Sequence, residues 1–532
     1  MNVHLLHPDR DLDLEVVLAR HSEALSDDLG LDVLLDRMAD GDERIRAACR
    51  SVLLSGLRDV DEVRYRQAVV ADALRAPEVF AQLYEAIVAG LDLAKRSYSG
   101  LFRDAPDAIV RRAVERLQVY ADVLQRLRQD TAPVRSRMGS EGVTALFELF
   151  ATQFDEPYLG EVEAQLEELT FPRGVLFGAR LGRGAVGTGF QLKRPRAQGW
   201  LSRSLDRSGA SFEVAERDDD SIESLGRLRD QALAEVAVVL SQASDDIEVF
   251  LRQLRDELAV LIGAARLHEA LTTKGEPTCF PEVVAPTEEE PHAEAQARVP
   301  PPARLTARGL YDPALSLQLA DRAVGNDLDA DGALLVLITG ANQGGKSTLL
   351  RSIGTAQLLL QAGLFVPATA FAGSTGGQVY THFGREEDQE LRRGKLEEEL
   401  NRMRTIVERI RPGDLLLANE SFAATNEREG SELARQVFRA HLDLGVRVVA
   451  VTHLYDLAES LHRTESSRGV FLRAQREEDG ERTFRIEPGA PLPTSYGQDL
   501  YRRIFGEEPS GSSTADDPPA EDGRDPQPHG GA

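Results

Sequence analysis

Gly340-Ala-Asn-Gln-Gly-Gly-Lys-Ser347 is the stretch that decides the fold of the C-terminal half. It matches the pattern G-x-x-x-x-G-K-[ST]. It lies between an apolar run, LLVLIT (Leu334 to Thr339), and a helical pattern from Lys346 to Gln361 that ends at Gly363. In this context the motif binds phosphate, because the loop N–H groups and the helix N-terminus face the anion. We therefore predict a nucleotide-binding P-loop.

The roles within this loop follow from the chemistry of ATP. Lys346 is expected to reach the β- and γ-phosphates, and Ser347 is expected to bind Mg²⁺. A chance glycine-rich turn is the alternative, and the flanking strand and helix argue against it. The residues expected to bind the nucleotide are Gly340, Asn342, Gly344, Gly345, Lys346, Ser347 and Thr348.

Two further apolar runs end in polar side chains. LLLANE ends in Asn419 and Glu420, and VRVVAVT (Val446 to Thr452) is followed by His453. Apolar strands alternating with helices indicate a parallel sheet covered on both faces. Glu420 is the candidate base or water-positioning group, and His453 is the candidate γ-phosphate sensor, with a purely structural histidine as the alternative. Asn419 replaces the usual Asp, so it would contact Mg²⁺ through a water without supplying charge, which predicts slow hydrolysis.

The N-terminal part has helical periodicity. Apolar residues recur at helical spacing in residues 77–94, 110–127 and 247–262. We expect an α-helical lever with a small β-like clamp insertion, followed by an α/β P-loop ATPase domain of the ABC type. The expected division is a helical core and lever at 1–170, a basic β-like clamp insertion at 171–215, a long helix returning to the core at 216–285, an acidic Pro-rich linker at 286–303, the ATPase domain at 304–506 and a disordered acidic tail at 507–532.

The insertion is locally basic in an acidic chain. Between Phe171 and Arg207 there are eight basic residues and a single acidic one, Asp206. A solvated hairpin is one interpretation. The other is an element that contacts the phosphates of double-stranded DNA, because Arg and Lys pair with the backbone without identifying its sequence. The candidate DNA-binding residues are Arg180, Arg183, Lys193, Arg194 and Arg196.

Composition limits the class of protein. The 532 residues carry a formal net charge of −26, which argues against a general nucleic-acid binder and makes the basic insertion the feature to test. No apolar run is long enough to cross a membrane, and the N-terminus lacks the pattern of a secretory signal. Two cysteines form no disulfide framework and no zinc site. We expect a cytoplasmic protein.

Several motifs together resemble the MutS family of DNA mismatch repair ATPases. ITGANQGGKSTLLRSIG resembles the phosphate loop of that family, and Asn326-Asp327 matches the pair that precedes its first strand. THFGREEDQELRRGKLEEEL resembles the stretch from its central strand through its composite-site signature. NESFAATNEREG matches in length its acidic strand and the following loop, and FRIEPGAPLPTSYGQDL resembles its closing segment, with Ser495-Tyr496-Gly497 as the recognisable end. The resemblance covers residues 304–506 and implies an ATP- and Mg²⁺-dependent homodimer that binds DNA.

The chain also departs from the family pattern. Gly394 stands where the resemblance implies a serine that contacts nucleotide across the dimer, and Lys395 is a candidate substitute. We identify no N-terminal mismatch-recognition domain and no C-terminal nuclease-like module. Gly376-Gly377-Gln378 resembles part of a transporter signature, but an apparent strand follows it and we expect a turn. The favoured function is an ATP-switched DNA clamp in mismatch repair or recombination, and the alternative is an ATP-switched protein–protein module that does not bind DNA.

Overall fold

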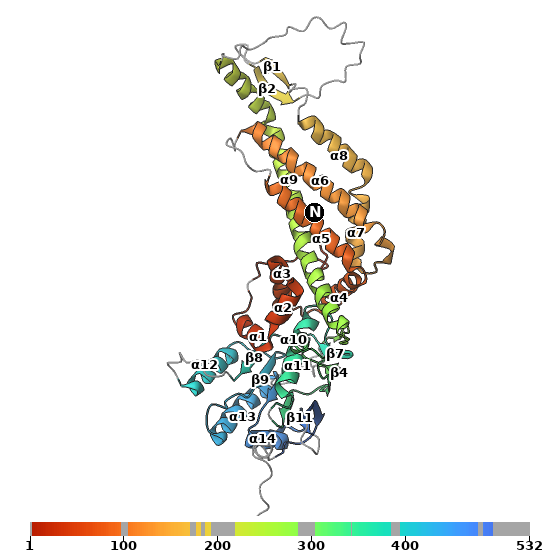
Figure 1. Ribbon diagram of the computed structural model, residues 1–532. Coiled ribbons are helices and arrows are strands. Elements are labelled where there is room, and N and C mark those ends of the chain that lie inside the picture. The colour runs from red at the N-terminus through yellow and green to blue at the C-terminus, as the bar shows by residue number, and fades with distance from the viewer. Residues whose placement is uncertain are drawn as a thin grey trace, which may run out of the picture.

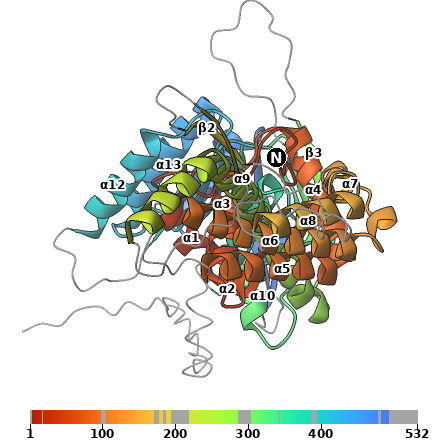
Figure 2. The same cartoon turned by 90° about the horizontal axis from the view of Figure 1, so that it is seen from above.

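The computed structural model describes residues 3–16, 18–96, 105–170, 177–181, 187–192, 219–285, 304–341, 343–384, 394–476 and 482–492. A rod of helices stands on an α/β domain, and the β1–β2 hairpin lies at the far end of the rod (Figure 1). Seen along the rod, α12 and α13 lie on the opposite side of the molecule from α7 and α8 (Figure 2). The N-terminal region is thus helical and the C-terminal region is mixed α/β.

One long helix organises the helical region. α9 (Asp219–Thr273) has 55 residues and is about 80 Å long at 1.5 Å per residue. Its apolar stripe, including Phe250, Leu254 and Leu258, is fully buried against the other helices. The helices of this region that contact α9 include α2 (Leu31–Ala39), α3 (Glu43–Ser55), α4 (Val60–Arg75), α5 (Pro77–Arg96) and α6 (Pro106–Thr131). The region also contains α1 (Ser22–Leu29), α7 (Glu141–Thr152) and α8 (Glu156–Leu169). No helix in the described ranges is apolar over enough of its length to span a bilayer.

The predicted helices are confirmed. The 77–94 pattern is α5, the 110–127 pattern lies in α6, and the 247–262 pattern lies in α9. The β-like insertion contains a real hairpin, since β1 (Phe177–Leu181) pairs antiparallel with β2 (Gly187–Leu192). Arg180 lies in β1 opposite Thr188. The other four candidate DNA contacts, Arg183, Lys193, Arg194 and Arg196, lie outside the described residues, as do residues 286–303 and 507–532.

The α/β domain is built on a six-stranded sheet with the order β12-β11-β6-β10-β9-β8. β6, β8, β9, β10 and β11 run parallel, and β12 is antiparallel at the edge. Alternate residues of β6 belong to two different hydrophobic cores. Val336 and Ile338 lie in the core that includes α11. Leu335 and Leu337 lie in the core that includes α13 and α14. The predicted parallel sheet with both faces covered is confirmed. The strands are β6 (Leu335–Thr339), β8 (Val379–Phe383), β9 (Leu415–Asn419), β10 (Arg447–Val451), β11 (Gly469–Arg476) and β12 (Arg482–Pro488); the helices are α11 (Lys346–Gln361), α12 (Lys395–Val407), α13 (Glu427–Leu444) and α14 (Tyr455–Glu465).

A second sheet joins the two halves of the chain. It has the order β3-β7-β4-β5, formed by β3 (Glu282–Val284), β4 (Leu305–Leu310), β5 (Asn326–Asp329) and β7 (Ala370–Ser374), with α10 (Pro313–Gln318) beside it. β3 pairs parallel with β7 and is therefore part of a sheet of the α/β domain. The domain division predicted from the sequence groups β3 with the long helix, in residues 216–285. Gly376 and Gly377 lie in a loop before β8, as expected for a turn.

The N-terminal segment 3–12 is fastened to the long helix by one carboxylate. Glu257 on α9 is fully buried and accepts hydrogen bonds from the backbone N–H groups of Leu5 (2.8 Å), Leu6 (3.0 Å) and Leu12 (2.8 Å). Burial raises the pKa of Glu257 to about 7, against the lowering effect of those three donors. A buried acceptor that satisfies three backbone donors holds this segment in one place.

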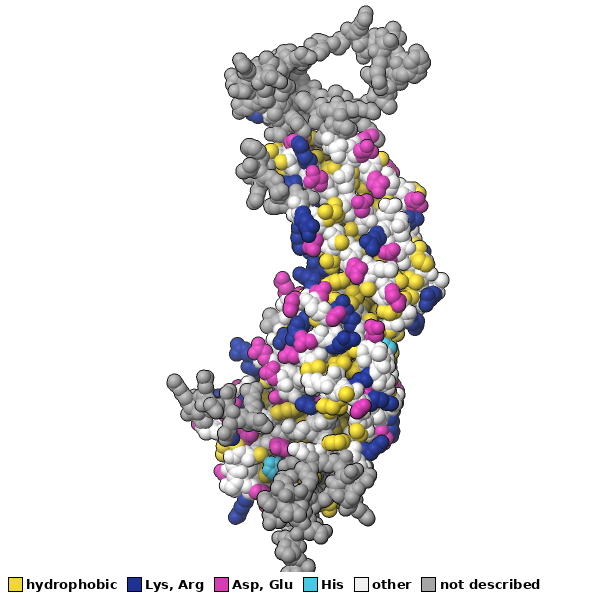
Figure 3. Space-filling model, viewed as in Figure 1, with side chains coloured by type: hydrophobic (Ala, Val, Ile, Leu, Met, Phe, Trp, Pro, Cys, Tyr) yellow, Lys and Arg dark blue, Asp and Glu magenta, His cyan; other side chains and the backbone are white. Residues whose placement is uncertain are grey.

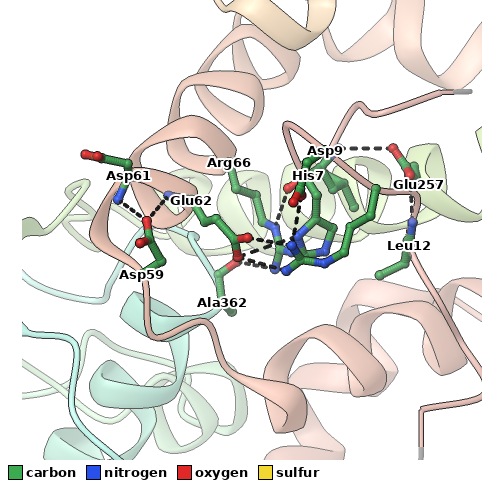
Figure 4. Close-up of polar contacts among 11 residues, drawn as sticks. His7, Asp9, Leu12, Asp59, Asp61, Glu62, Arg66, Glu257 and Ala362 are labelled. Carbon is green, nitrogen blue, oxygen red and sulfur yellow. Dashed lines mark hydrogen bonds and ion pairs between the residues drawn. The ribbon is translucent and has the colours of Figure 1, made fainter.

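Arg66 on α4 connects the same segment to the helix that follows the P-loop (Figure 4). Its guanidinium donates to the backbone oxygen of Leu6 (3.2 Å) and to that of Ala362 at the C-terminus of α11 (3.2 Å). A third N–H group donates to Nε2 of His7 at 2.7 Å. Burial, helped by the Arg66 charge, lowers the pKa of His7 to about 3, so His7 is a neutral acceptor. The rod and the α/β domain are therefore joined by directed hydrogen bonds as well as by apolar packing.

Candidate nucleotide site

The P-loop lies between β6 and α11, as predicted. Gly340 (φ 115°) and Gly345 (φ 88°) take left-handed conformations that favour glycine, and Gly345 caps α11. Lys346 is buried, and its ammonium group donates to the backbone oxygens of Gly340 and Ala341, both at 2.9 Å. Burial lowers the pKa of Lys346, and the Glu420 carboxylate opposes that effect. The lysine is thus held inside the turn where we predict that phosphates bind.

The loop glycines are also required by packing against β11 and β12. A Cβ on Gly344 would lie 2.8 Å from Cβ of Ala474, and one on Gly345 would lie 3.1 Å from the backbone oxygen of Phe484. The Asn326 side chain holds β12 in place, because its amide donates to the oxygen of Phe484 (3.2 Å) and its oxygen accepts from the N–H of Ile486 (2.7 Å). Asn326 thus supports the loop through β12.

Two oxygen-bearing side chains meet at the start of α11. The Ser347 hydroxyl donates to the amide oxygen of Asn419, at the end of β9, at 2.9 Å. Mg²⁺ prefers oxygen ligands and commonly retains several waters, and a hydroxyl beside an amide oxygen fits that preference. The pair supplies no charge of its own, and Glu420 is the next residue along the chain. The donor set therefore fits a weakly held magnesium ion.

Glu420 and His453 face each other across the ends of β9 and β10. Oε2 of Glu420 lies 3.8 Å from Nδ1 of His453, and both side chains are about 40% exposed. Contact with His453 lowers the pKa of Glu420 more than burial raises it, and contact with Glu420 raises the pKa of His453. They open into a cavity of about 140 Å³ lined by Thr339, Gly340, Glu420, Thr452, His453, Leu454, Tyr455, Ala458, Pro491 and Leu492.

The structure brings most of the predicted site residues together. Gly340, Gly344, Gly345, Lys346, Ser347 and Thr348 form the loop and the first turn of α11, and Asn419, Glu420 and His453 face them. Asn342 lies outside the described residues. Gly394 immediately precedes α12 and is exposed. The catalytic and nucleotide-binding roles of these residues remain predictions. The motifs did not indicate a buried group beside Glu420, formed by His382, Glu399 and Ser421.

The order of strands and the position of the glycine-rich turn define a P-loop nucleotide-binding domain. Residues 336–502 match the model for MutS domain V, and residues 58–274 match the model for the MutS2 N-terminal domain. Both segments therefore match models of MutS-type domains, and in the MutS family domain V is the ATPase domain. This agrees with the resemblance seen in the sequence motifs.

Named relatives match over part of their length. The chain is 32% identical over 172 residues to Endonuclease MutS2 of Carboxydothermus hydrogenoformans, which is 32% of this chain and 21% of the relative. It is 30% identical over 170 residues to Endonuclease MutS2 of Thermus thermophilus, covering 32% and 23%. It is 29% identical over 192 residues to DNA mismatch repair protein MutS of Chloroflexus aurantiacus, covering 35% and 20%. These matches span about a fifth of each relative.

Proposed function

We propose that this protein hydrolyses ATP and binds double-stranded DNA as a homodimeric, nucleotide-switched clamp in DNA repair or recombination. The observation that carries the proposal is the meeting of Lys346, Ser347, Asn419, Glu420 and His453 at one edge of the sheet. That edge is where parallel α/β sheets bind ligands, since the helix N-terminus and the strand ends converge there. The names of the relatives support the link to DNA.

The proposed chemistry assigns one task to each side chain. Lys346 would neutralise the β- and γ-phosphates of ATP, and Ser347 with Asn419 would hold Mg²⁺. Glu420 would accept or orient the proton of the attacking water, and its lowered pKa keeps it ionised at neutral pH. His453 would hold Glu420 in place and lie close to the γ-phosphate. The bound metal ion supplies charge neutralisation at the transferred phosphate.

The proposed DNA contact is the basic segment that carries the β1–β2 hairpin, through Arg180, Arg183, Lys193, Arg194 and Arg196. The visible face of the described rod shows basic and acidic side chains interspersed (Figure 3). Several arginines of the helical region are paired, as Arg116 is with Asp245 (3.2 Å) and Arg44 with Asp256 (3.1 Å). Since phosphate binding needs uncompensated positive charge, the rod is a poorer candidate than the hairpin segment.

The proposed dimer contact is the start of α12. Gly394 and Lys395 are both exposed, and a Cβ on Gly394 would meet no atom of the described residues within 4 Å. A lysine beside this open position would supply positive charge to the phosphates bound by a second subunit. The competing function is an ATP-switched module that binds proteins only, which the net charge of −26 favours.

The deciding experiment is steady-state ATP turnover alone and with homoduplex, mismatched or branched DNA. We expect Mg²⁺-dependent turnover that at least one DNA changes, and we expect Glu420→Gln to abolish most of it. Thr464→Ser, an exposed position on α14 away from the site, is the matched control. Turnover that no DNA changes, together with no duplex binding, would support the protein-only function. Wild-type turnover in Glu420→Gln would refute the role of Glu420.

A further inference from the structure

The backbone around Glu420 is held in an unusual conformation. Glu420 has φ 52° and Phe422 has φ 63°, so two non-glycine residues within three positions are left-handed. Such a conformation is strained for a non-glycine residue and persists only where its surroundings determine it. The N–H of Glu420 donates to the oxygen of Val451 at 2.9 Å, and Phe422 is fully buried. These two contacts fix the ends of the turn but leave Ser421 between them.

Ser421 is fixed by a buried histidine on β8. Nδ1 of His382 lies 2.7 Å from the Ser421 hydroxyl, which also lies 3.0 Å from the backbone oxygen of His382. Nε2 of His382 lies 3.1 Å from the backbone oxygen of Glu399. Burial lowers the pKa of His382 to about 4, so the ring is neutral with a single N–H. The arrangement fits a ring that donates from Nε2 to the backbone oxygen of Glu399, while the single proton of the Ser421 hydroxyl faces two acceptors, Nδ1 and the backbone oxygen of His382.

The Glu399 side chain lies beside the rest of the turn. It extends from α12, is only 6% exposed, and its carboxyl faces the backbone N–H groups of Phe422 and Ala424, which lower its pKa. Burial raises the pKa of this carboxyl, which the Arg402 charge and those two N–H groups oppose. Arg402 also donates to the backbone oxygen of Phe383 at 2.8 Å, so α12 is bound to the end of β8 as well.

We infer that Ser421, His382 and Glu399 are positioning residues that hold Glu420 where it can act on the attacking water. The inference rests on the proposed role of Glu420 in ATP hydrolysis. His382 comes from β8, Ser421 from the turn after β9, and Glu399 from α12, behind the residue that would face the water. Their effect passes through the backbone of the strained turn, and α12 begins at the exposed Lys395. A partner bound at the start of α12 would thus act on Glu420 through Glu399.

Positioning residues should change the chemical step and leave nucleotide binding alone. Lys346 and Ser347 lie on α11, and their side chains donate to the P-loop backbone and to Asn419, so ATP affinity should stay within about twofold of wild type. Misplacement of a catalytic group by about 1 Å costs on the order of a hundredfold in rate. We expect Ser421→Ala and Glu399→Ala each to lower kcat by about tenfold to a hundredfold.

The test compares kcat and ATP affinity of the full chain for these two variants. Glu399→Gln is the conservative rescue, since its amide oxygen can still face the backbone N–H groups of Phe422 and Ala424, and we expect kcat near wild type. Ser431→Ala is the matched control, because Ser431 is a buried serine of α13 whose hydroxyl has no hydrogen-bond partner among the described residues. Fluorescent-nucleotide binding confirms that each variant is folded.

A double variant separates positioning from general damage. In the Glu420→Gln background, Ser421→Ala should not lower the residual single-turnover rate further, because its effect acts only through Glu420. A further drop would identify a structural defect and overturn the inference. Wild-type kcat in Ser421→Ala and Glu399→Ala, with Glu420→Gln inactive, would overturn the inference alone. A Glu420→Gln enzyme as fast as wild type would overturn the proposed role of Glu420 and the inference together.

Discussion

At the residue scale, Asn419 sets the charge of the site. Its amide oxygen accepts from Ser347 at 2.9 Å, as a carboxylate also would, so the exchange to Asp keeps the geometry and adds a charge. We expect Asn419→Asp to lower the Mg²⁺ concentration for half-maximal turnover by about tenfold, or ~1.4 kcal/mol. The measurement is turnover against free Mg²⁺. Asn426→Asp is the control, because Asn and Asp are both good caps for the N-terminus of α13. An unchanged Mg²⁺ dependence in Asn419→Asp would show that residue 419 does not help to hold the metal ion.

His453 and Glu420 together set the pH dependence. A base is active when ionised, so turnover should be lost as the pH falls through the pKa of Glu420. His453 lowers that pKa, and its removal leaves burial to raise it. We expect the acid limb of the kcat–pH profile to move to higher pH in His453→Gln. His462→Gln on α14 is the control; an acid limb that stays in place in His453→Gln would show that His453 does not act on Glu420.

At the element scale, the sequence predicts those helices and strands that are determined by residues close together in the chain. The bounds of α11, Lys346 to Gln361, follow from a glycine-rich start and an apolar stripe, and β6 follows from an uninterrupted apolar run. β3 has three residues and pairs with β7, about ninety positions away, so no local signal reveals it. His382 and Glu399 lie in one of the MutS-like segments and Ser421 lies in another, and nothing in those segments indicates that the three side chains meet. Only the folded chain brings such residues together.

The long-range contacts of α9 lead to a prediction for the N-terminal segment. Oε2 of Glu257 accepts from the N–H groups of Leu5 and Leu6, and Oε1 accepts from the N–H of Leu12. Glutamine has a single acceptor oxygen, so it can accept either from Leu5 and Leu6 or from Leu12, but not from both. A buried N–H without an acceptor costs about 1–3 kcal/mol. We expect Glu257→Gln to speed hydrogen exchange in residues 3–12 by roughly 10- to 100-fold at pH 8. Exchange as slow as in the exposed control Glu235→Gln would show that these hydrogen bonds do not stabilise the segment.

At the scale of the whole molecule, charge is divided unevenly. The chain has 88 acidic and 62 basic residues, yet residues 171–207 hold eight basic residues and one acidic. A body of negative charge repels DNA, and basic and acidic side chains are interspersed on the rod face that Figure 3 shows. Any attraction for the duplex should therefore be concentrated at the hairpin end, about the length of α9 from the nucleotide site. ATP-driven changes would reach it along that helix.

The concentration of charge makes DNA binding a salt-dependent prediction. Each phosphate contact contributes about −0.9 to the slope of log K against log salt, so five contacts contribute about −4 to −5. Replacing Arg180, Arg183, Lys193, Arg194 and Arg196 with alanine should remove most of that slope and of the duplex affinity, while basal turnover remains. Fluorescence anisotropy with a labelled homoduplex at several salt concentrations measures both. Arg37→Ala, Arg428→Ala and Arg463→Ala, all exposed in the described structure, are the matched controls. If the five replacements and the control replacements gave equal slopes of log K against log salt, the DNA contact would lie elsewhere. The slope reports the number of phosphate contacts, whatever the DNA sequence.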